Sequence, residues 1–191
     1  NPQVPSRIRH LIDGDGEDPG PVLADMARRL VAGGAQALAM PCNTAHHYAD
    51  AIRASVSVPL IDMVALSVTH AASLVPAGGS VGVLASPAVR LTGLFDRALA
   101  TAGLTAIYAK DDDAVLSIIR HIKANGPSEE SRQALAGVSR RLLARGAQVQ
   151  MVACTEFSLI ADAVDAAAVS FDTLDRLVSG HRLAVRNAAR R

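Results

Sequence analysis

Apolar residues fall into two patterns that alternate along the whole chain. Short continuous runs rich in Val, Leu and Ile, flanked by glycine, proline or polar residues, are typical of buried parallel strands. Strands are predicted at 37–40, 58–63, 80–84, 104–108, 149–153 and 169–172. Longer stretches with apolar residues at helical spacing predict helices at 21–33, 44–55, 64–75, 88–102, 111–124, 128–145, 156–165 and 173–190. This alternation predicts an α/β fold with parallel sheets flanked by helices.

One stretch of the pattern occurs twice. Residues 28–42 read RRLVAGGAQALAMPC, and residues 140–154 read RRLLARGAQVQMVAC. The offset between the copies is 112 residues throughout, and eight of the fifteen positions are identical. The only two cysteines of the chain, Cys42 and Cys154, end the two copies. The repeat therefore predicts two pseudo-symmetric α/β lobes related by duplication, with a site in the cleft between them.

Both copies have the same expected local structure. A helix ends at Gly34 or Gly146, which suits the left-handed position after a helix. A short apolar strand follows, and the cysteine stands where that strand ends and the next helix begins. Ligands bind at this edge of open α/β sheets. A helix N-terminus favours anions, so we expect it to lower the pKa of each thiol and to attract a substrate carboxylate.

A turn-rich segment at 76–79, Pro-Ala-Gly-Gly, gives the strongest boundary signal in the chain. It predicts a first lobe at 1–78 and a second lobe at 79–191, with the C-terminal helix packing back on the first lobe. The opening segment contains Pro2 and Pro5 and predicts no strand. We therefore expect the first lobe to lack an N-terminal strand. Residues 11–20 are predicted to form a solvated loop, because their carboxylates do not fit a calcium-loop register.

Composition narrows the classes of function. Half of the 191 residues are hydrophobic, which is ample for a core, and the net charge is only +1. Neither a nucleic-acid nor a membrane partner is expected from such a balance. No long apolar span or secretory signal is visible. Two cysteines at equivalent positions of a repeat indicate free thiols facing one site in a reducing compartment, so a cytoplasmic protein is expected.

Two equivalent thiols facing each other suit one chemistry in particular. Inversion at an acidic carbon needs a base on one face of the substrate and an acid on the other, and a thiol pair can exchange these roles. The plainer alternative is that each cysteine is a small buried apolar residue. Metal binding is not expected, since no CxxC or HxxxH motif accompanies the thiols and His46 and His47 are adjacent. A redox CxxC pair is absent as well.

The segments P-C-N-T-A-H at 41–46 and A-C-T-E at 153–156 resemble the two signatures of the aspartate/glutamate racemase superfamily. They are closer to the aspartate racemase branch, because glutamate racemases usually have Cys-Thr-His where this chain has Glu156. The resemblance implies an isomerase, an amino-acid racemase that needs no cofactor and no pyridoxal phosphate. It further implies a small-molecule amino-acid substrate, aspartate or glutamate, and a homodimer.

The resemblance also implies roles for individual residues. Cys42 and Cys154 would be the two catalytic bases. The predicted substrate-binding residues are Asn43, Thr44, Thr155, Glu156, Arg7 and Lys123. The first three would hold the α-carboxylate, Glu156 would face the ammonium group or support the thiol, and Arg7 and Lys123 would meet a distal carboxylate.

Plainer roles stay open for several of these residues. Arg7 and Lys123 are equally well read as solvated side chains, Asn43 and Thr44 as helix caps, and His46 as a packing residue.

Some positions depart from the family pattern. Segment 85–89, Ala-Ser-Pro-Ala-Val, stands where a Gly-Thr pair is common, so Val89 offers no hydroxyl there. Ile119 or a neighbour replaces an aromatic residue. Alternative functions are therefore a racemase or isomerase of another substrate, such as a hydantoin, or an inactive relative that binds a small carboxylate.

Overall fold

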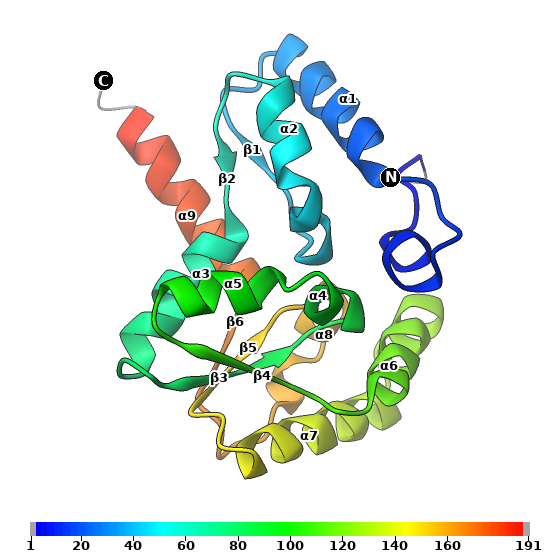
Figure 1. Ribbon diagram of the computed structural model, residues 1–191, viewed down its shortest axis with the longest axis vertical. Coiled ribbons are helices and arrows are strands. Elements are labelled where there is room, and N and C mark those ends of the chain that lie inside the picture. The colour runs from blue at the N-terminus through cyan, green and yellow to red at the C-terminus, as the bar shows by residue number, and fades with distance from the viewer. Residues whose placement is uncertain (1–2, 189–191) are drawn as a thin grey trace.

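The computed structural model describes residues 3–188, which form two parallel β-sheets with helices packed around them (Figure 1). The predicted fold class, an α/β protein with parallel sheets flanked by helices, is confirmed. Within the described residues, no helix is long and apolar enough to cross a membrane.

The smaller sheet pairs β1 (Leu38–Ala39) with β2 (Leu60–Ile61). Helices α1 (Pro19–Ala32) and α2 (Ala49–Ser55) pack beside it, and a short 3₁₀ helix, η2 (Thr44–Tyr48), precedes α2. Its core contains the buried side chains of Ala27, Leu38 and Ile52. This small core is built from α1, the rest of the first copy of the repeat and the segment after it.

The larger sheet has four parallel strands in the order β4-β3-β5-β6. Their bounds are Ser80–Leu84 for β3, Thr105–Tyr108 for β4, Val149–Val152 for β5 and Ser170–Asp172 for β6. Val83 of β3 is in register with Met151 of β5, and both side chains face the same core. Leu84 and Val152 come next along these strands and face the opposite core, as the two-residue period of a strand requires.

Helices cover both faces of the larger sheet (Figure 1). On one face lie α3 (Met63–Leu74), α4 (Pro87–Leu91) and α5 (Leu94–Thr101). On the other lie α6 (Asp112–Asn125), α7 (Glu129–Ala144) and α8 (Thr155–Ser158). Burial on both faces explains why these strands read as continuous apolar runs. Gln150 interrupts one run, and its buried amide nitrogen donates to the carbonyl of Ser139 at 2.9 Å.

The last helix, α9 (Thr173–Ala188), packs against α3. A Cβ atom at Gly180 would lie 2.4 Å from a methyl carbon of Leu66, so glycine allows the two helices to approach closely. Nearby, the rings of His70 and Phe171 meet edge to face with centroids 4.8 Å apart. Since α3 also joins the core of the larger sheet, the division at residue 78 stays a prediction.

The two copies of the repeat end their helices with the same turn. Gly34 and Gly146 have φ angles of 96° and 88°, in the left-handed region that the sequence predicts for them. The following amides, of Ala35 and Ala147, each donate to the carbonyl five residues earlier, at 3.0 and 3.1 Å. Each copy therefore delivers its cysteine from the same local geometry, helix to glycine turn to strand.

Several predicted elements are shorter or broken in the structure. The helix predicted at 44–55 begins as the 3₁₀ helix η2, and the one at 156–165 reduces to α8 and a 3₁₀ turn, η3 (Ala161–Ala163). The helix predicted at 88–102 is interrupted at Gly93, whose φ of 60° leaves the helical region and separates α4 from α5. The loop predicted at 11–20 begins inside a π-helix, η1 (Arg9–Asp13).

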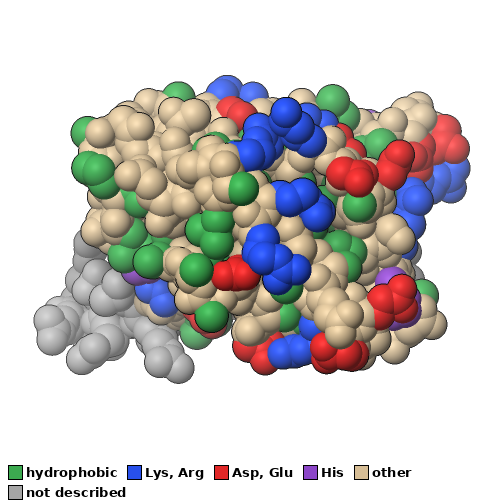
Figure 2. Space-filling model, turned by 90° about the horizontal axis from the view of Figure 1, so that it is seen from below, with side chains coloured by type: hydrophobic (Ala, Val, Ile, Leu, Met, Phe, Trp, Pro, Cys, Tyr) green, Lys and Arg blue, Asp and Glu red, His purple; other side chains and the backbone are tan. Residues whose placement is uncertain are grey.

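The surface carries charges of both signs. Figure 2 shows one face of the molecule, on which Lys and Arg side chains lie interspersed with Asp and Glu side chains. Opposite charges also form ion pairs, such as Arg132 with Asp162 and, at 3.7 Å, Arg140 with Asp165. This face therefore shows no broad field of a single sign.

Candidate active site

A small cavity of about 70 Å³ lies where the two cysteine-bearing loops meet. Loops after β1, β3 and β5 contribute to it, together with α6 and the N-terminal segment. Seven of the eight predicted site residues line it, namely Arg7, Cys42, Thr44, Lys123, Cys154, Thr155 and Glu156. Both thiols therefore face one space, although they are 112 positions apart in the chain.

The cavity also has lining residues that the sequence analysis did not propose as site residues: Ser6, Ile8, Ser86 and Ile119. Ile119 is the residue that, by the family resemblance, we expected to replace an aromatic residue. Ser86 follows β3, which pairs with β5 in the middle of the larger sheet. Its hydroxyl therefore lies at the edge of the sheet where parallel strands present ligand-binding groups. Its position at the end of an apolar run was the signal that could have identified it.

The Ser86 hydroxyl connects two segments of the site. It lies 3.1 Å from the hydroxyl of Thr44 in η2. Pro87 then opens α4, which fixes the backbone after Ser86. Val89, in the same segment, is fully buried in the core and does not line the cavity. The polar group of this loop is therefore supplied by Ser86.

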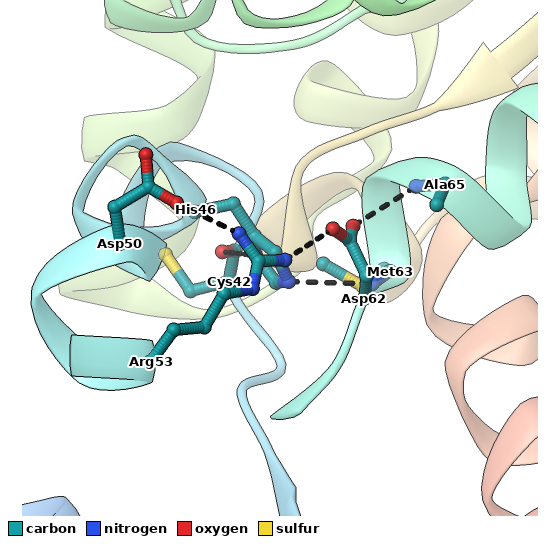
Figure 3. A network of polar contacts seen from close by, with 7 residues as sticks. All are labelled: Cys42, His46, Asp50, Arg53, Asp62, Met63 and Ala65. Carbon is teal, nitrogen blue, oxygen red and sulfur yellow. Dashed lines mark hydrogen bonds and ion pairs between the residues drawn. The ribbon is translucent and has the colours of Figure 1, made fainter. Parts of the chain in front are cut away.

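Cys42 is held through its backbone by a buried histidine. Nδ1 of His46 lies 2.8 Å from the carbonyl oxygen of Cys42, and Nε2 accepts the Met63 N–H at 3.3 Å (Figure 3). One ring nitrogen must donate and the other accept, so His46 is neutral with its proton on Nδ1. Burial lowers the pKa of His46 and favours this neutral form. The histidine thus joins the first cysteine loop to the start of α3.

A charged bridge stands beside this histidine. Arg53 of α2 pairs with Asp62 at 2.5 Å and with Asp50 at 3.0 Å (Figure 3). The other carboxylate oxygen of Asp62 accepts the N–H of Ala65 at 2.9 Å and caps α3. Together with His46, the bridge fixes α3 relative to the first cysteine loop.

Asn43 turns away from the cavity. Its side chain is buried, and its Nδ2 donates to the hydroxyl of Thr173 at 3.0 Å. Thr173 in turn donates to the carbonyl of Val152 at 3.0 Å, two residues before Cys154. The predicted capping role of Asn43 is wrong, because its side chain makes no cap bond to η2. Its role in binding a substrate carboxylate stays a prediction.

Cys154 stands in more enclosed surroundings than Cys42. Its thiol donates to Oε2 of Glu156 at 3.2 Å, and the Thr155 hydroxyl donates to the same oxygen at 3.4 Å. Burial and the negative charge of Glu156 raise the pKa of Cys154 well above its ordinary value, against the opposing effect of the Phe157 and Glu156 backbone N–H groups. The expectation of a lowered thiol pKa is therefore wrong for Cys154. The helix that follows it, α8, has only four residues.

Two cations border the cavity. Lys123 reaches from α6 to within 3.9 Å of Oε1 of Glu156, while 65% of its side chain stays exposed. Arg7 donates to the carbonyl of Pro5 at 3.2 Å. An anionic small molecule entering the cavity would therefore meet positive charge beside the thiols.

Other cavities are larger but lack the thiols. One of about 460 Å³ lies between α6 and α7, and another of about 330 Å³ is bordered by His47 and Arg97. Among residues 3–180, whose side chains the structure describes, no group of three or more His, Cys, Asp or Glu side chains could hold a metal ion. The small cavity with both cysteines is thus the candidate active site.

Comparisons with known proteins match the chain to one family and its fold to several solved structures. The family model described as Asp/Glu/hydantoin racemase matches residues 1–188. The fold is similar to Picrophilus torridus aspartate racemase, with a TM-score of 0.79 and 21% identity over 93% of this chain and 73% of that chain. A putative Asp/Glu racemase from Yersinia pestis has a TM-score of 0.73 and 26% identity over 87% of this chain and 74% of that chain. Glutamate racemase from Francisella tularensis, in complex with D-glutamate, has a TM-score of 0.68 and 15% identity over 88% of this chain and 66% of that chain.

Proposed function

Because the chain belongs to the Asp/Glu/hydantoin racemase family, we propose that it interconverts the enantiomers of an acidic amino acid, aspartate or glutamate. The observation that carries this proposal is that both cysteines of the chain line one cavity of about 70 Å³. Drug-sized ligands occupy pockets of roughly 300–1,000 Å³. The cavity therefore suits a small metabolite held between two sulfur atoms.

The proposed reaction uses the two thiols as base and acid. A thiolate removes the proton from Cα on one face, and the C–H electron pair stays on the substrate as an enolate-like carbanion. The opposing thiol then gives its proton to the other face of Cα. The first sulfur ends as a thiol and the second as a thiolate, so Cys42 and Cys154 exchange roles with each turnover. The step balances with the chain's own groups and calls for no pyridoxal phosphate.

Hydrogen-bond donors around the cavity suit the charge that develops in this reaction. The hydroxyls of Thr44, Ser86 and Thr155 line the cavity and can donate to the α-carboxylate as it takes on enolate character. The backbone N–H groups of Glu156 and Phe157 face the Cys154 sulfur and favour its thiolate. The backbone N–H groups are fixed by the fold before substrate enters, which is the condition for effective electrostatic stabilisation.

The charges at the cavity favour a substrate with two carboxylates. Lys123 and Arg7 are cations that the reaction at Cα does not itself use. A distal carboxylate of aspartate or glutamate would pair with Lys123, and the substrate ammonium group would face Glu156. The similar structures include an aspartate racemase and a glutamate racemase in complex with D-glutamate, which supports this choice of substrate.

Hydrogen exchange at Cα tests the proposal directly. The purified protein, without added cofactor, would be incubated in deuterated water with single enantiomers of the common amino acids and with a hydantoin. We expect loss of the Cα–H signal and appearance of the opposite enantiomer for aspartate or glutamate. Exchange only with a hydantoin would assign the alternative substrate. Binding of an acidic amino acid without any exchange would indicate a catalytically inactive relative.

A further inference from the structure

We propose that Glu156 is a positioning residue that keeps a proton on Cys154 in the empty site, so that Cys154 begins the reaction as the acid and Cys42 as the base. The assignment of acid and base rests on the proposed function. The proton on Cys154 is a property of the unliganded protein and can be tested by itself.

The repeat shows that this group is specific to one of the two thiols. Glu156 stands two residues after Cys154, and the position 112 residues earlier is Thr44, two residues after Cys42. The two loops have therefore diverged at a position that faces the cavity in both copies. Among the described residues that line the cavity, Glu156 is the one acidic side chain. The duplicated site is thus electrostatically unequal.

The contacts of Glu156 locate the shared hydrogen. Sγ of Cys154 lies 3.2 Å from Oε2 of Glu156, so one hydrogen sits between sulfur and oxygen. Lys123 faces Oε1 at 3.9 Å, and the Thr155 hydroxyl donates to Oε2 at 3.4 Å. A cation and a hydroxyl donor both suit an ionised carboxylate. The hydrogen therefore belongs to sulfur, and the thiol donates.

Burial acts in the same direction. Cys154 is only 8% exposed, and removing a thiolate from water disfavours it. The remaining charged or titratable side chains that line the cavity are Arg7, Lys123 and Cys42. Lys123 Nζ lies 3.9 Å from Oε1 of Glu156, so its positive charge partly offsets the negative charge that Glu156 presents to the thiol. Removing the charge of Glu156 should consequently lower the pH at which Cys154 titrates, whereas removing the charge of Lys123 should raise it.

Carbon-13 NMR of cysteine can measure this titration without substrate. Cysteine labelled at Cβ gives two signals in this chain, since it has two cysteines, and Cys42→Ala and Cys154→Ala assign them. In Glu156→Gln, which keeps size but removes charge, we expect the Cys154 midpoint to fall by about one pH unit or more. Glu130→Gln is the matched control, because Glu130 is an exposed carboxylate in the first turn of α7. It should leave the midpoint unchanged.

A second variant keeps the test decisive if Glu156→Gln folds poorly. Lys123→Met removes an exposed cation and should raise the Cys154 midpoint, whereas Lys110→Met, at an exposed site away from the cavity, should not. An unchanged or raised midpoint in Glu156→Gln, or a lowered one in Lys123→Met, would overturn the proposal. So would a wild-type Cys154 that is already a thiolate at neutral pH. Failure of the racemase function is a separate result, because it appears as absent Cα exchange while this titration needs no substrate.

Discussion

Asn43 and Thr173 are 130 residues apart in the chain, and the side-chain amide of Asn43 donates to the hydroxyl of Thr173 at 3.0 Å in a buried hydrogen bond. Asn43 directly follows Cys42. The Thr173 hydroxyl in turn donates a hydrogen bond to the carbonyl of Val152, which lies two residues before Cys154. This chain of two hydrogen bonds therefore links the two segments that carry the sulfur atoms.

Replacing Thr173 by Val tests this link. The change preserves the shape of the side chain but leaves the buried amide of Asn43 without its acceptor, which should lower the free energy of unfolding by about 1–3 kcal/mol. We also expect kcat/KM for racemisation to fall by about tenfold or more, because misplacing reacting groups by about 1 Å can cost about 100-fold. Urea unfolding and a racemisation assay measure the two effects. Thr101→Val, which removes an exposed hydroxyl bonded to Arg97, should change stability by no more than about 0.5 kcal/mol.

Single-cysteine variants separate the two faces of the substrate. In Cys154→Ala, Cys42 can remove a proton from one enantiomer and return it only to the same face. We expect racemisation to fall by at least about 100-fold, the scale of general acid–base catalysis, while Cα exchange with retention persists for one enantiomer. Cys42→Ala should show the same for the opposite enantiomer. Proton NMR in deuterated water, combined with chiral chromatography, measures both. A single-cysteine variant that racemises at the wild-type rate would contradict the two-base mechanism.

His46 should make the stability depend on pH in a defined window. An unfolded histidine titrates near about pH 6.5, and burial lowers the pKa of His46 in the folded protein. Below about pH 6.5 the unfolded chain therefore binds more protons than the folded one, and the free energy of unfolding falls as pH decreases toward the lowered pKa. Above that window the neutral ring keeps its full contribution. Urea unfolding at several pH values checks this.

His46→Gln removes the titrating group from that position. It should flatten the pH dependence and lower stability at neutral pH, since the bonds to Cys42 and Met63 are disturbed. His47→Gln is the neighbouring control, because His47 is exposed, and it should retain the wild-type slope. An unchanged slope in His46→Gln would contradict the assignment of the window to His46.

Local features of the chain were readable from sequence because they depend on neighbouring residues. The glycine turns at Gly34 and Gly146 and the apolar strand runs follow from backbone sterics and burial, so the α/β class could be predicted. Contacts between distant segments could not. The Asn43–Thr173 bond depends on where α9 begins, whereas the sequence suggested only a substrate contact or a local cap for Asn43, and the cap does not form.

The site could likewise be predicted only in part. The equivalent cysteines identified the cavity because parallel strands end at one edge of a sheet. The unequal chemistry of the thiols was missed, because it depends on burial and on the direction in which the Glu156 side chain points. Helix position alone suggested a lowered pKa for both thiols. For Cys154, desolvation and a carboxylate outweigh the backbone N–H groups.

Lys123 provides the test of substrate class. If its ammonium group pairs with a distal carboxylate, Lys123→Met should lower kcat/KM for aspartate or glutamate by about 10- to 100-fold, the scale of a charged hydrogen bond. The variant also alters the surroundings of Glu156 and hence of Cys154. That second effect acts on every substrate alike, so the ratio of kcat/KM for the acidic amino acid to that for its side-chain amide isolates recognition of the carboxylate. We expect this ratio to fall in Lys123→Met and to hold in Lys110→Met. An unchanged ratio in Lys123→Met would assign the distal carboxylate to Arg7, the other cation at the cavity.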